Sequence, residues 1–267
     1  MHGQPRTTSN MVAIAVAVAM SHNRKCLLTQ THFNLNNLES VLIGKRENSR
    51  EVFMDIGLDG LASVVKLRAL DKATIENYSI PLMHKKLTLL PGTVGGNRKV
   101  FADDMGKTIS MLLSEANKHY DMVFVDVNSG SDEVSKKILE QADVILVNLC
   151  QNRSVLDNYM PSWHPEGKNI MYLIGSYDKD SSYNIHNLKL MYKYLSKDNT
   201  CVIPYNTGFM DAQSDGGVIK YMKKNIAAKK EGSNTYFIGC VKEAAVKLVK
   251  QTSEKRGGEI QWRIISS

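Results

Sequence analysis

The first residues of the chain place a glycine and two hydroxyl side chains directly ahead of an apolar segment. Gly3 and the pair Thr7-Thr8 precede the apolar run 11–20. A phosphate-binding loop uses glycine backbone N–H groups to surround phosphate oxygens, a lysine to reach the terminal phosphates and a hydroxyl to hold Mg²⁺. The glycine and the hydroxyls are present here, whereas the lysine is missing. A Thr-Thr-Ser run also caps ordinary helices, so this segment alone leaves both interpretations open.

A carboxylate at the end of an apolar run supports the phosphate-binding interpretation. The run 121–126 ends at Asp126, and three more apolar runs follow at 142–148, 171–174 and 201–204. Continuous apolar runs separated by helical stretches are typical of parallel strands that are buried on both faces. Ligands in that architecture lie at the carboxyl ends of the strands, where Asp126 and Pro204 stand. We therefore expect an α/β fold with a mostly parallel, twisted sheet and helices on both faces.

Taken together, these segments resemble the ParA/MinD family of deviant P-loop ATPases. The resemblance is nearest to the TadZ-like branch, which is involved in pilus assembly, and to its firmicute relatives. The family loop reads Lys-Gly-Gly-x-Gly-Lys-Thr-Thr. On this pattern Gly3 matches the first glycine and Thr8 the Mg²⁺-binding threonine, but His2 and Thr7 stand at the two lysine positions. The two later glycines are replaced by Gln4 and Arg6.

Later segments follow the family pattern in order, and the resemblance covers nearly the whole chain. Residues 27–39 match a segment with two aspartates followed by Asn-Leu-Asp, but Gln30 and His32 stand at the aspartate positions. Residues 126–130 match the family's Asp-x-Pro-x-Gly segment, and residues 203–206 match the Ile-Pro-x-Asp region beside the adenine.

The resemblance implies a weak site for ATP and Mg²⁺. Thr8 and Asp126 would hold the Mg²⁺ ion. The nucleotide would contact Gly3, Gln4, Pro5, Arg6, Thr7, Thr8, Ser9, Pro204, Tyr205 and Asn206. Loss of both lysines removes the cations that offset charge on the transferring phosphoryl group, and Gln30 and His32 remove carboxylates expected to order water. No residue is assigned a catalytic role, and hydrolysis is expected to be poor.

Two functions stay open at this point. The favoured one is a ParA/MinD-like nucleotide-binding positioning or adaptor protein, a pseudo-ATPase with little or no hydrolysis. The alternative is an active ParA-type partition or localisation ATPase that acts on DNA or on a pilus or secretion machine. In either case the resemblance implies a cytoplasmic homodimer with a protein partner in a localisation, pilus or secretion machine.

Length and composition favour one globular unit. The 267 residues are enough for a single ParA/MinD-like domain over 1–267. Family members begin with a central strand that leads into the phosphate loop, and this sequence starts at the loop. An N-terminal truncation therefore stays open, and we expect the sheet either to lack its central strand or to borrow substitute pairing.

The cysteines and the apolar runs indicate the cellular compartment in which the protein is expected. The four cysteines have no metal-ligand spacing and suit a reducing cytoplasm. No stretch approaches the ~20 apolar residues of a transmembrane helix. The run 11–20 could instead be the core of a signal peptide, but the polar residues 7–10 suit a helix start better.

The excess of basic residues is compatible with binding to nucleic acid. The net charge is +7, and basic residues gather at 84–86 and at 220–230. Such clusters can attract DNA phosphates without sequence preference. A solvated helical surface explains the same clusters and is the favoured interpretation, because no aromatic stacking platform is evident beside them.

Apolar periodicity predicts alternating strands and helices. Strands are expected near 25–30, 86–90, 121–126, 143–148, 169–174 and 200–203. Helices are expected near 8–21, 36–43, 59–76, 101–118, 132–141, 152–160, 183–195 and 234–251.

Overall fold

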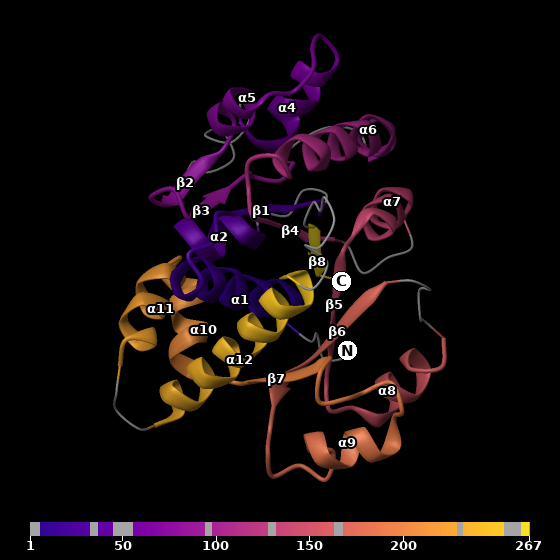
Figure 1. The fold of residues 1–267 in the computed structure, drawn as a ribbon, viewed down its shortest axis with the longest axis vertical. Helices are drawn as coiled ribbons and strands as arrows, with labels where there is room; N and C mark the ends of the chain where they lie inside the picture. Colours follow the sequence, from indigo (N-terminus) through magenta and orange to yellow (C-terminus); the bar gives the residue numbers. More distant parts are fainter. Residues whose placement is uncertain are drawn as a thin grey trace.

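One eight-stranded sheet runs through the structure in the order β2-β3-β1-β4-β8-β5-β6-β7 (Figure 1). The computed structural model describes residues 6–32, 37–44, 56–93, 98–127, 132–162, 168–228, 232–253 and 263–266. The strands are β1 (Cys26–Gln30), β2 (Ile80–Met83), β3 (Leu87–Leu89), β4 (Met122–Asp126), β5 (Val144–Leu149), β6 (Asn169–Tyr177), β7 (Thr200–Pro204) and β8 (Arg263–Ser266). Every neighbouring pair is parallel except β2 with β3, so the expected fold class is confirmed.

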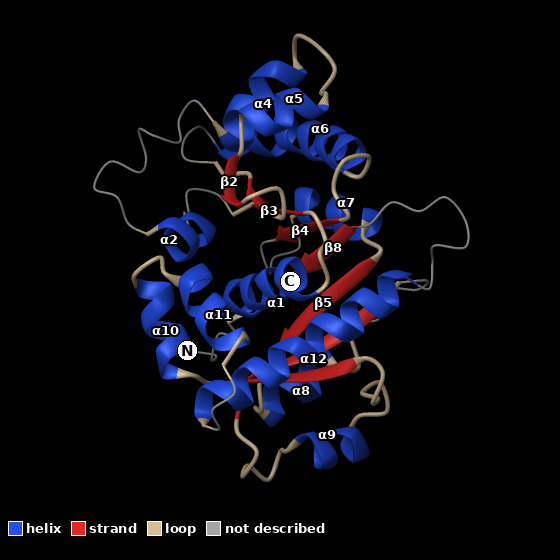
Figure 2. Ribbon diagram, turned by 60° about the vertical axis from the view of Figure 1, so that its left-hand side comes forward, coloured by secondary structure: helices blue, strands red, loops and turns tan. Residues whose placement is uncertain are grey.

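Helices cover both faces of this sheet (Figure 2). One face packs against α1 (Thr7–Ser21), α2 (Asn37–Ile43), α10 (Thr207–Ser214), α11 (Val218–Ile226) and α12 (Ser233–Ser253). The other packs against α4 (Gly57–Val65), α5 (Lys72–Asn77), α6 (Arg98–Ala116), α7 (Glu133–Gln141), α8 (Arg153–Tyr159) and α9 (Ile185–Met191). The two faces form separate hydrophobic cores, which explains the continuous apolar strands: Phe124 joins one core, and Val123 and Val125 join the other.

Helix α1 is the buried centre of the first core. Its residues from Asn10 to Ala19 are all buried, and it packs against α12 and α11 as well as the sheet. A helix that is apolar all round requires neighbours on every side, which α1 has here. This packing fixes the start of α1 against the carboxyl edge of the sheet.

The expected helix over 59–76 is wrong, because the structure has two helices there. Helix α4 ends at Val65, and α5 begins after Asp71, whose side chain accepts a hydrogen bond from the Thr74 amide. An aspartate N-cap of this kind starts a new helix and separates it from the preceding one. Strand β2 was also missed, and the expected helix over 183–195 is shorter, because α9 ends at Met191.

The central position of the sheet is filled by the last described segment of the chain. Strand β8 pairs in parallel with both β4 and β5, with Ile265 opposite Val125 and Ile145. Of the two expected outcomes, the sheet thus has substitute pairing rather than a gap. Pairing on both sides satisfies the backbone groups that β4 and β5 would otherwise leave exposed.

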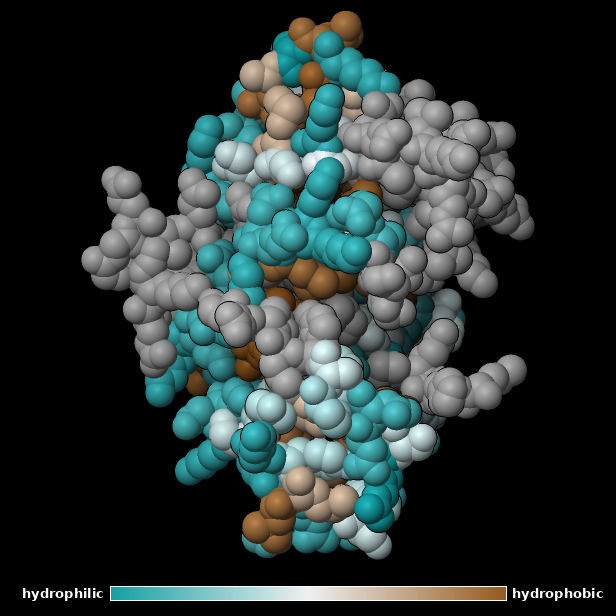
Figure 3. All heavy atoms as spheres, turned by 90° about the vertical axis from the view of Figure 1, so that its right-hand side faces the viewer, coloured by the Kyte–Doolittle hydropathy of each residue, from teal (hydrophilic) through white to brown (hydrophobic). Residues whose placement is uncertain are grey.

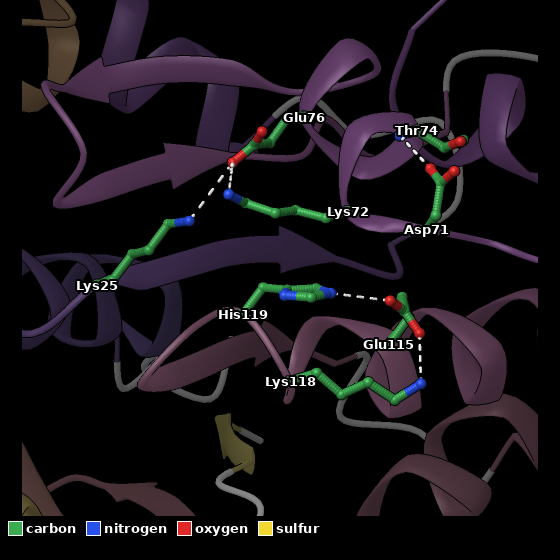
Figure 4. Close-up of polar contacts among 8 residues, drawn as sticks. All are labelled: Lys25, Asp71, Lys72, Thr74, Glu76, Glu115, Lys118 and His119. Carbon is green, nitrogen blue, oxygen red and sulfur yellow. Dashed lines mark hydrogen bonds and ion pairs between the residues drawn. The ribbon is translucent and has the colours of Figure 1, made fainter.

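Ion pairs surround the start of β1, at the opposite end of the strand from Gln30 (Figure 4). Lys25 and Lys72 approach Glu76 at 3.4 and 3.8 Å. In the same view Glu115 contacts Lys118 and His119, and these hydrogen bonds, that of Lys118 first, lower the pKa of Glu115. These pairs are partly or fully exposed, so they contribute little to stability, and they lie away from the carboxyl edge of the sheet.

Candidate functional site

The first turn of α1 meets the end of β4 through a direct side-chain contact. Thr8 Oγ1 donates a hydrogen bond to Asp126 Oδ2 at 2.5 Å, although the two residues lie 118 positions apart in the sequence. Asp126 is fully buried at the carboxyl end of β4. The structure therefore brings together the two residues that the sequence predicts as Mg²⁺ ligands.

The surroundings of Asp126 leave one of its oxygens without a partner. His32 Nε2 lies 3.3 Å from Oδ2, and the Thr31 amide donates to the backbone oxygen of Asp126. Oδ1 accepts no hydrogen bond from the described residues. A buried carboxylate oxygen normally has a partner, since burial without one is unfavourable.

These oxygens fit Mg²⁺. Mg²⁺ takes oxygen ligands and usually retains several waters, so one carboxylate, one hydroxyl and substrate phosphates suffice. Among the described residues no group of three or more His, Cys, Asp or Glu side chains could hold a metal ion by itself. One carboxylate and one hydroxyl would leave the other coordination positions of the ion to waters or to oxygens of a ligand.

Buried hydroxyls without partners line the same edge of the sheet. Within the described part of the chain, the Oγ1 atoms of Thr29, Thr31 and Thr93 are buried and make no hydrogen bond. Thr29 and Thr31 lie at the end of β1, and Thr93 follows β3. Their concentration at one edge is typical of a ligand-facing surface rather than of a closed core.

Glu39 is a second carboxylate at this edge, and it was not predicted as a site residue from the sequence. It lies on α2, is buried, and accepts hydrogen bonds from Gln30 Nε2 at 2.8 Å and from the Gly92 amide at 2.7 Å. Burial raises the pKa of Glu39, and the hydrogen bond from Gly92 partly opposes this. Its match to the last position of the family's Asn-Leu-Asp segment was the signal that could have identified it.

Gly92 lies close against the Gln30 side chain. A Cβ atom at this position would lie 2.8 Å from Gln30 Cγ. A larger residue at this position would require the Gln30 side chain, which donates to Glu39, to shift.

Arg6 caps α1 in a conformation that glycine normally adopts. Its φ of 58° and ψ of 43° lie in the left-handed region, which agrees with its place at a glycine position of the family loop. The guanidinium lies 4.9 Å above the Tyr205 ring and donates to the Met210 sulfur. Arg6 thus links the start of α1 to the loop after β7.

The two residues that follow β7 differ in burial. Tyr205 is 54% exposed, whereas Asn206 is buried. Asn206 Oδ1 accepts from the Phe209 amide and from Tyr221 Oη, both at 2.8 Å, and its Nδ2 donates to Asn234 Oδ1. Asn206 therefore fixes the start of α10, while Tyr205 faces outward.

The remaining residues that the sequence predicts to contact the nucleotide lie near the start of α1 or at the end of β7. Thr7 and Ser9 are in its first turn, and Pro204 ends β7. The first turn of α1 has no acidic side chain, and its cap makes no side-chain hydrogen bond. The first N–H groups of a helix attract anions, so this terminus is suited to phosphate oxygens. Gly3, Gln4 and Pro5 lie outside the described residues, as do residues 128–130.

The fold is similar to that of solved ParA and MinD ATPases. The structure of a ParA family ATPase from Chlorobium tepidum matches with a TM-score of 0.67 at 16% identity, covering 90% of this chain and 92% of that one. The septum site-determining protein MinD from Pyrococcus horikoshii, complexed with Mg-ADP, matches with a TM-score of 0.67 at 18% identity and 94% coverage of both chains. A putative plasmid partition protein from Borrelia burgdorferi, bound to AMPPNP, has a TM-score of 0.58 at 16% identity and 96% coverage of both.

At these identities the likeness establishes the fold alone. No protein-family model matches the sequence, and no curated protein matches it.

Proposed function

We propose that the chain is a ParA/MinD-like nucleotide-binding positioning or adaptor protein with little or no ATP hydrolysis. The observation that carries this proposal is the hydrogen bond from Thr8 to the buried Asp126 carboxylate, at the amino end of α1. A hydroxyl and a carboxylate beside free helix N–H groups can hold Mg²⁺ and phosphate together. The solved structures of the same fold bound to Mg-ADP and to AMPPNP agree with this.

In the proposed complex, ATP phosphates lie over residues 3–9 at the start of α1. Thr8 and Asp126 hold Mg²⁺, which neutralises phosphate charge when it is bound. The base lies beside Pro204, Tyr205 and Asn206. Asn206 acts there by positioning the loop, because its side-chain oxygen is occupied by the Phe209 amide and Tyr221.

Poor hydrolysis follows from the side chains at the catalytic positions. His2 and Thr7 stand where the family has lysines. Gln30 donates to Glu39, so its amide hydrogen is engaged in packing α2 against β1. Arg6 is permanently charged, but its guanidinium lies on Tyr205 and Met210.

An active partition or localisation ATPase is the alternative, and Arg6 is the observation that favours it. Arg6 immediately precedes the first helical residue, so it supplies one permanent cation close to the proposed phosphates. If its side chain turns from Tyr205 to the phosphates, it would replace part of the lost lysine charge.

The partners in this proposal are a second copy of the chain and a localisation, pilus or secretion machine. The motif order that resembles the TadZ-like branch and its firmicute relatives supports the pilus assignment. The similarity to a plasmid partition structure is consistent with nonspecific DNA contact as a second arm of the same proposal. We propose a cytoplasmic location, and no helix among the described residues is long and apolar enough to cross a membrane.

Calorimetric titration with ATP and Mg²⁺ tests the proposal. We expect weak binding that requires Mg²⁺ and is reduced in Asp126→Ala. Asp198→Ala is the matched control, because Asp198 is exposed in the loop before β7. No heat, together with no thermal shift at saturating ATP, would remove nucleotide binding from the proposed function.

A further inference from the structure

Tyr205 is an exposed aromatic residue that directly follows β7 at the carboxyl edge of the sheet. It is 54% exposed, which makes it the most exposed large aromatic side chain among the described residues. On the face drawn in Figure 3, hydrophobic side chains form small groups among hydrophilic ones. An aromatic ring that stays exposed beside a proposed ligand site is available for contact with that ligand.

One face of the Tyr205 ring is covered by Arg6. The guanidinium carbon lies 4.9 Å from the ring centroid, and the same guanidinium donates to the Met210 sulfur. A cation above one face of an aromatic ring is attracted by the ring quadrupole, so the contact favours one orientation of the ring. Because more than half of Tyr205 remains exposed, the opposite face of the ring is open to solvent.

Asn206, the next residue, has a side-chain amide that is engaged within the protein. Its Oδ1 accepts from the Phe209 amide and from Tyr221 Oη, both at 2.8 Å. Its Nδ2 donates to Asn234 Oδ1 at 2.9 Å. Asn206 is also 5% exposed, so little of the amide is accessible to a ligand.

These contacts of Asn206 belong to a closed ring of hydrogen bonds. Asn234 Nδ2 donates to Asn225 Oδ1 at 3.2 Å, and Asn225 Nδ2 donates to the Tyr221 backbone oxygen at 2.9 Å. The Tyr221 hydroxyl completes the ring by donating to Asn206. The Phe209 N–H can only donate, so the amide oxygen of Asn206 must face it and the amide orientation is determined. Turning Asn206 toward a ligand would break several of these bonds at once.

Aromatic packing holds the same ring of hydrogen bonds in place. The Tyr221 ring contacts Phe209 at 5.7 Å and Phe237 at 6.4 Å between centroids, each in an edge-on arrangement. Phe209 and Phe237 are themselves 4.8 Å apart and buried. Arrangements of this kind stabilise aromatic clusters beyond the area that they bury. The cluster therefore keeps the Tyr221 hydroxyl on Asn206.

The state of Asn206 has a consequence for base selection. Adenine and guanine differ at the purine edge, where adenine carries an amino donor and guanine a carbonyl acceptor. A protein distinguishes them strongly when a side chain bonds to that edge, because the wrong base then leaves a polar group unpaired. The Asn206 amide is the side-chain amide nearest in sequence to Tyr205, and its hydrogen bonds are already used within the protein.

We propose that Tyr205 binds the nucleotide base by stacking alone, so that the site takes purine nucleoside triphosphates without distinguishing adenine from guanine. The base lies on the face of the Tyr205 ring opposite Arg6. Stacking on an aromatic side chain tolerates different bases, because every base has a π-face. The inference rests on the proposed nucleotide site and adds to it the class of nucleotide and the residue that contacts the base.

Calorimetric titration of the full chain with ATP, GTP and inorganic tripolyphosphate, each with Mg²⁺, tests this inference. We expect dissociation constants for ATP and GTP within about tenfold of each other. Tyr205→Ala should bind both nucleotides at least about fivefold more weakly, whereas tripolyphosphate, which has no base, should bind as it does to the parent. Tyr205→Phe keeps the ring and should bind as the parent does. Tyr194→Ala is the matched control, because Tyr194 is also an exposed ring beside a cation, Lys193, and lies outside the proposed site.

Three results would overturn the inference and leave the proposed nucleotide site intact. One is a preference for either purine above about tenfold, since the base edge would then be read. The others are unchanged nucleotide binding in Tyr205→Ala and an equal loss in Tyr194→Ala. Absence of binding of ATP, GTP and tripolyphosphate alike would instead remove the nucleotide site itself, and the inference with it. Thermal unfolding of each variant confirms that a loss of binding does not reflect misfolding.

Discussion

The Thr8 hydroxyl donates a hydrogen bond to the Asp126 carboxylate and so joins the start of α1 to the end of β4. The contact depends on the packing of α1 and on the pairing of β4, both of which involve residues outside the site. Burial of α1 on all sides fixes the position of Thr8, and the parallel pairing of β4 with β1 fixes that of Asp126. The edge where these elements meet is where open parallel sheets bind ligands.

Asp126 should be more important for Mg²⁺ than for folding. Asp126→Asn keeps the size of the side chain and an acceptor for Thr8, so we expect a loss of stability of about 1–3 kcal/mol at most. The Mg²⁺-dependent part of ATP binding should disappear, because the amide lacks the carboxylate charge. Chemical denaturation and calorimetry with and without Mg²⁺ measure the two effects. A variant that binds Mg-ATP as the parent does would remove Asp126 from the proposed metal site.

Glu39 should make stability depend on pH. Burial, the largest cause, raises its pKa above 4.5, so the folded state takes up a proton more readily than the unfolded state. The stability linked to protonated Glu39 is therefore complete below the unfolded pKa and is lost as the pH rises through the folded pKa. Glu39→Gln cannot ionise. We expect its stability relative to the parent to increase between about pH 4 and pH 7. Denaturant midpoints across this range measure the difference, and a constant difference would contradict the expectation.

The fold could be predicted because its signals are continuous and local. The apolar runs around Phe124 and Leu146 have buried side chains toward both cores, and such runs identify parallel strands without knowledge of their partners. The break after α4 was missed because the Asp71 cap lies inside an otherwise helical pattern. Strand β8 was missed because four residues give too little periodicity, and its place is set by the gap between β4 and β5.

Residues of the candidate site could be predicted from the sequence only where they belong to a recognisable motif. Thr8 and Asp126 stand at recognisable positions of the family motifs, and their hydrogen bond agrees with the prediction that both contact Mg²⁺. The pairing of Arg6 with Tyr205 and the burial of Glu39 beneath Gly92 depend on tertiary contacts between distant segments. No local pattern specifies such contacts.

Arg6 should be replaced more easily by glycine than by alanine. Its φ of 58° is unfavourable for any residue with a Cβ, so glycine relieves strain of about 1–2 kcal/mol. Both substitutions lose the contact with Tyr205, which at an exposed site contributes about 0.5–1 kcal/mol. Arg6→Gly should therefore be close to the parent in stability, and Arg6→Ala should be lower. Equal stabilities for the two variants would show that the left-handed conformation is not maintained in solution.

Strand β8 should be essential to the middle of the sheet. Ile265→Pro removes a backbone N–H from a strand that is paired on both sides, and we expect a loss of about 3 kcal/mol or more. Ile265→Val keeps the amide and serves as the control. Hydrogen exchange should accelerate at Val125 and Ile145, the partners of Ile265. Unchanged protection at both positions would mean that β8 does not occupy this place.

Restoring a lysine to the phosphate loop should restore hydrolysis. Thr7 stands at the family's second lysine position, directly before Thr8. A cation that stabilises the transferring phosphoryl group is worth about 10³-fold or more in rate, so Thr7→Lys should release phosphate much faster than the parent. The parent itself should stay near the uncatalysed background. Steady-state phosphate release, with and without DNA or lipid vesicles, measures both.

Two further variants separate a restored active site from a contaminant. Thr8→Ala in the Thr7→Lys background removes the hydroxyl that contacts Asp126, and the gained activity should be lost with it. Arg6→Gly in the parent background tests the alternative function. If the parent turns over ATP at a rate typical of an enzyme, the pseudo-ATPase proposal is wrong. Loss of that turnover in Arg6→Gly would then identify Arg6 as the replacement cation.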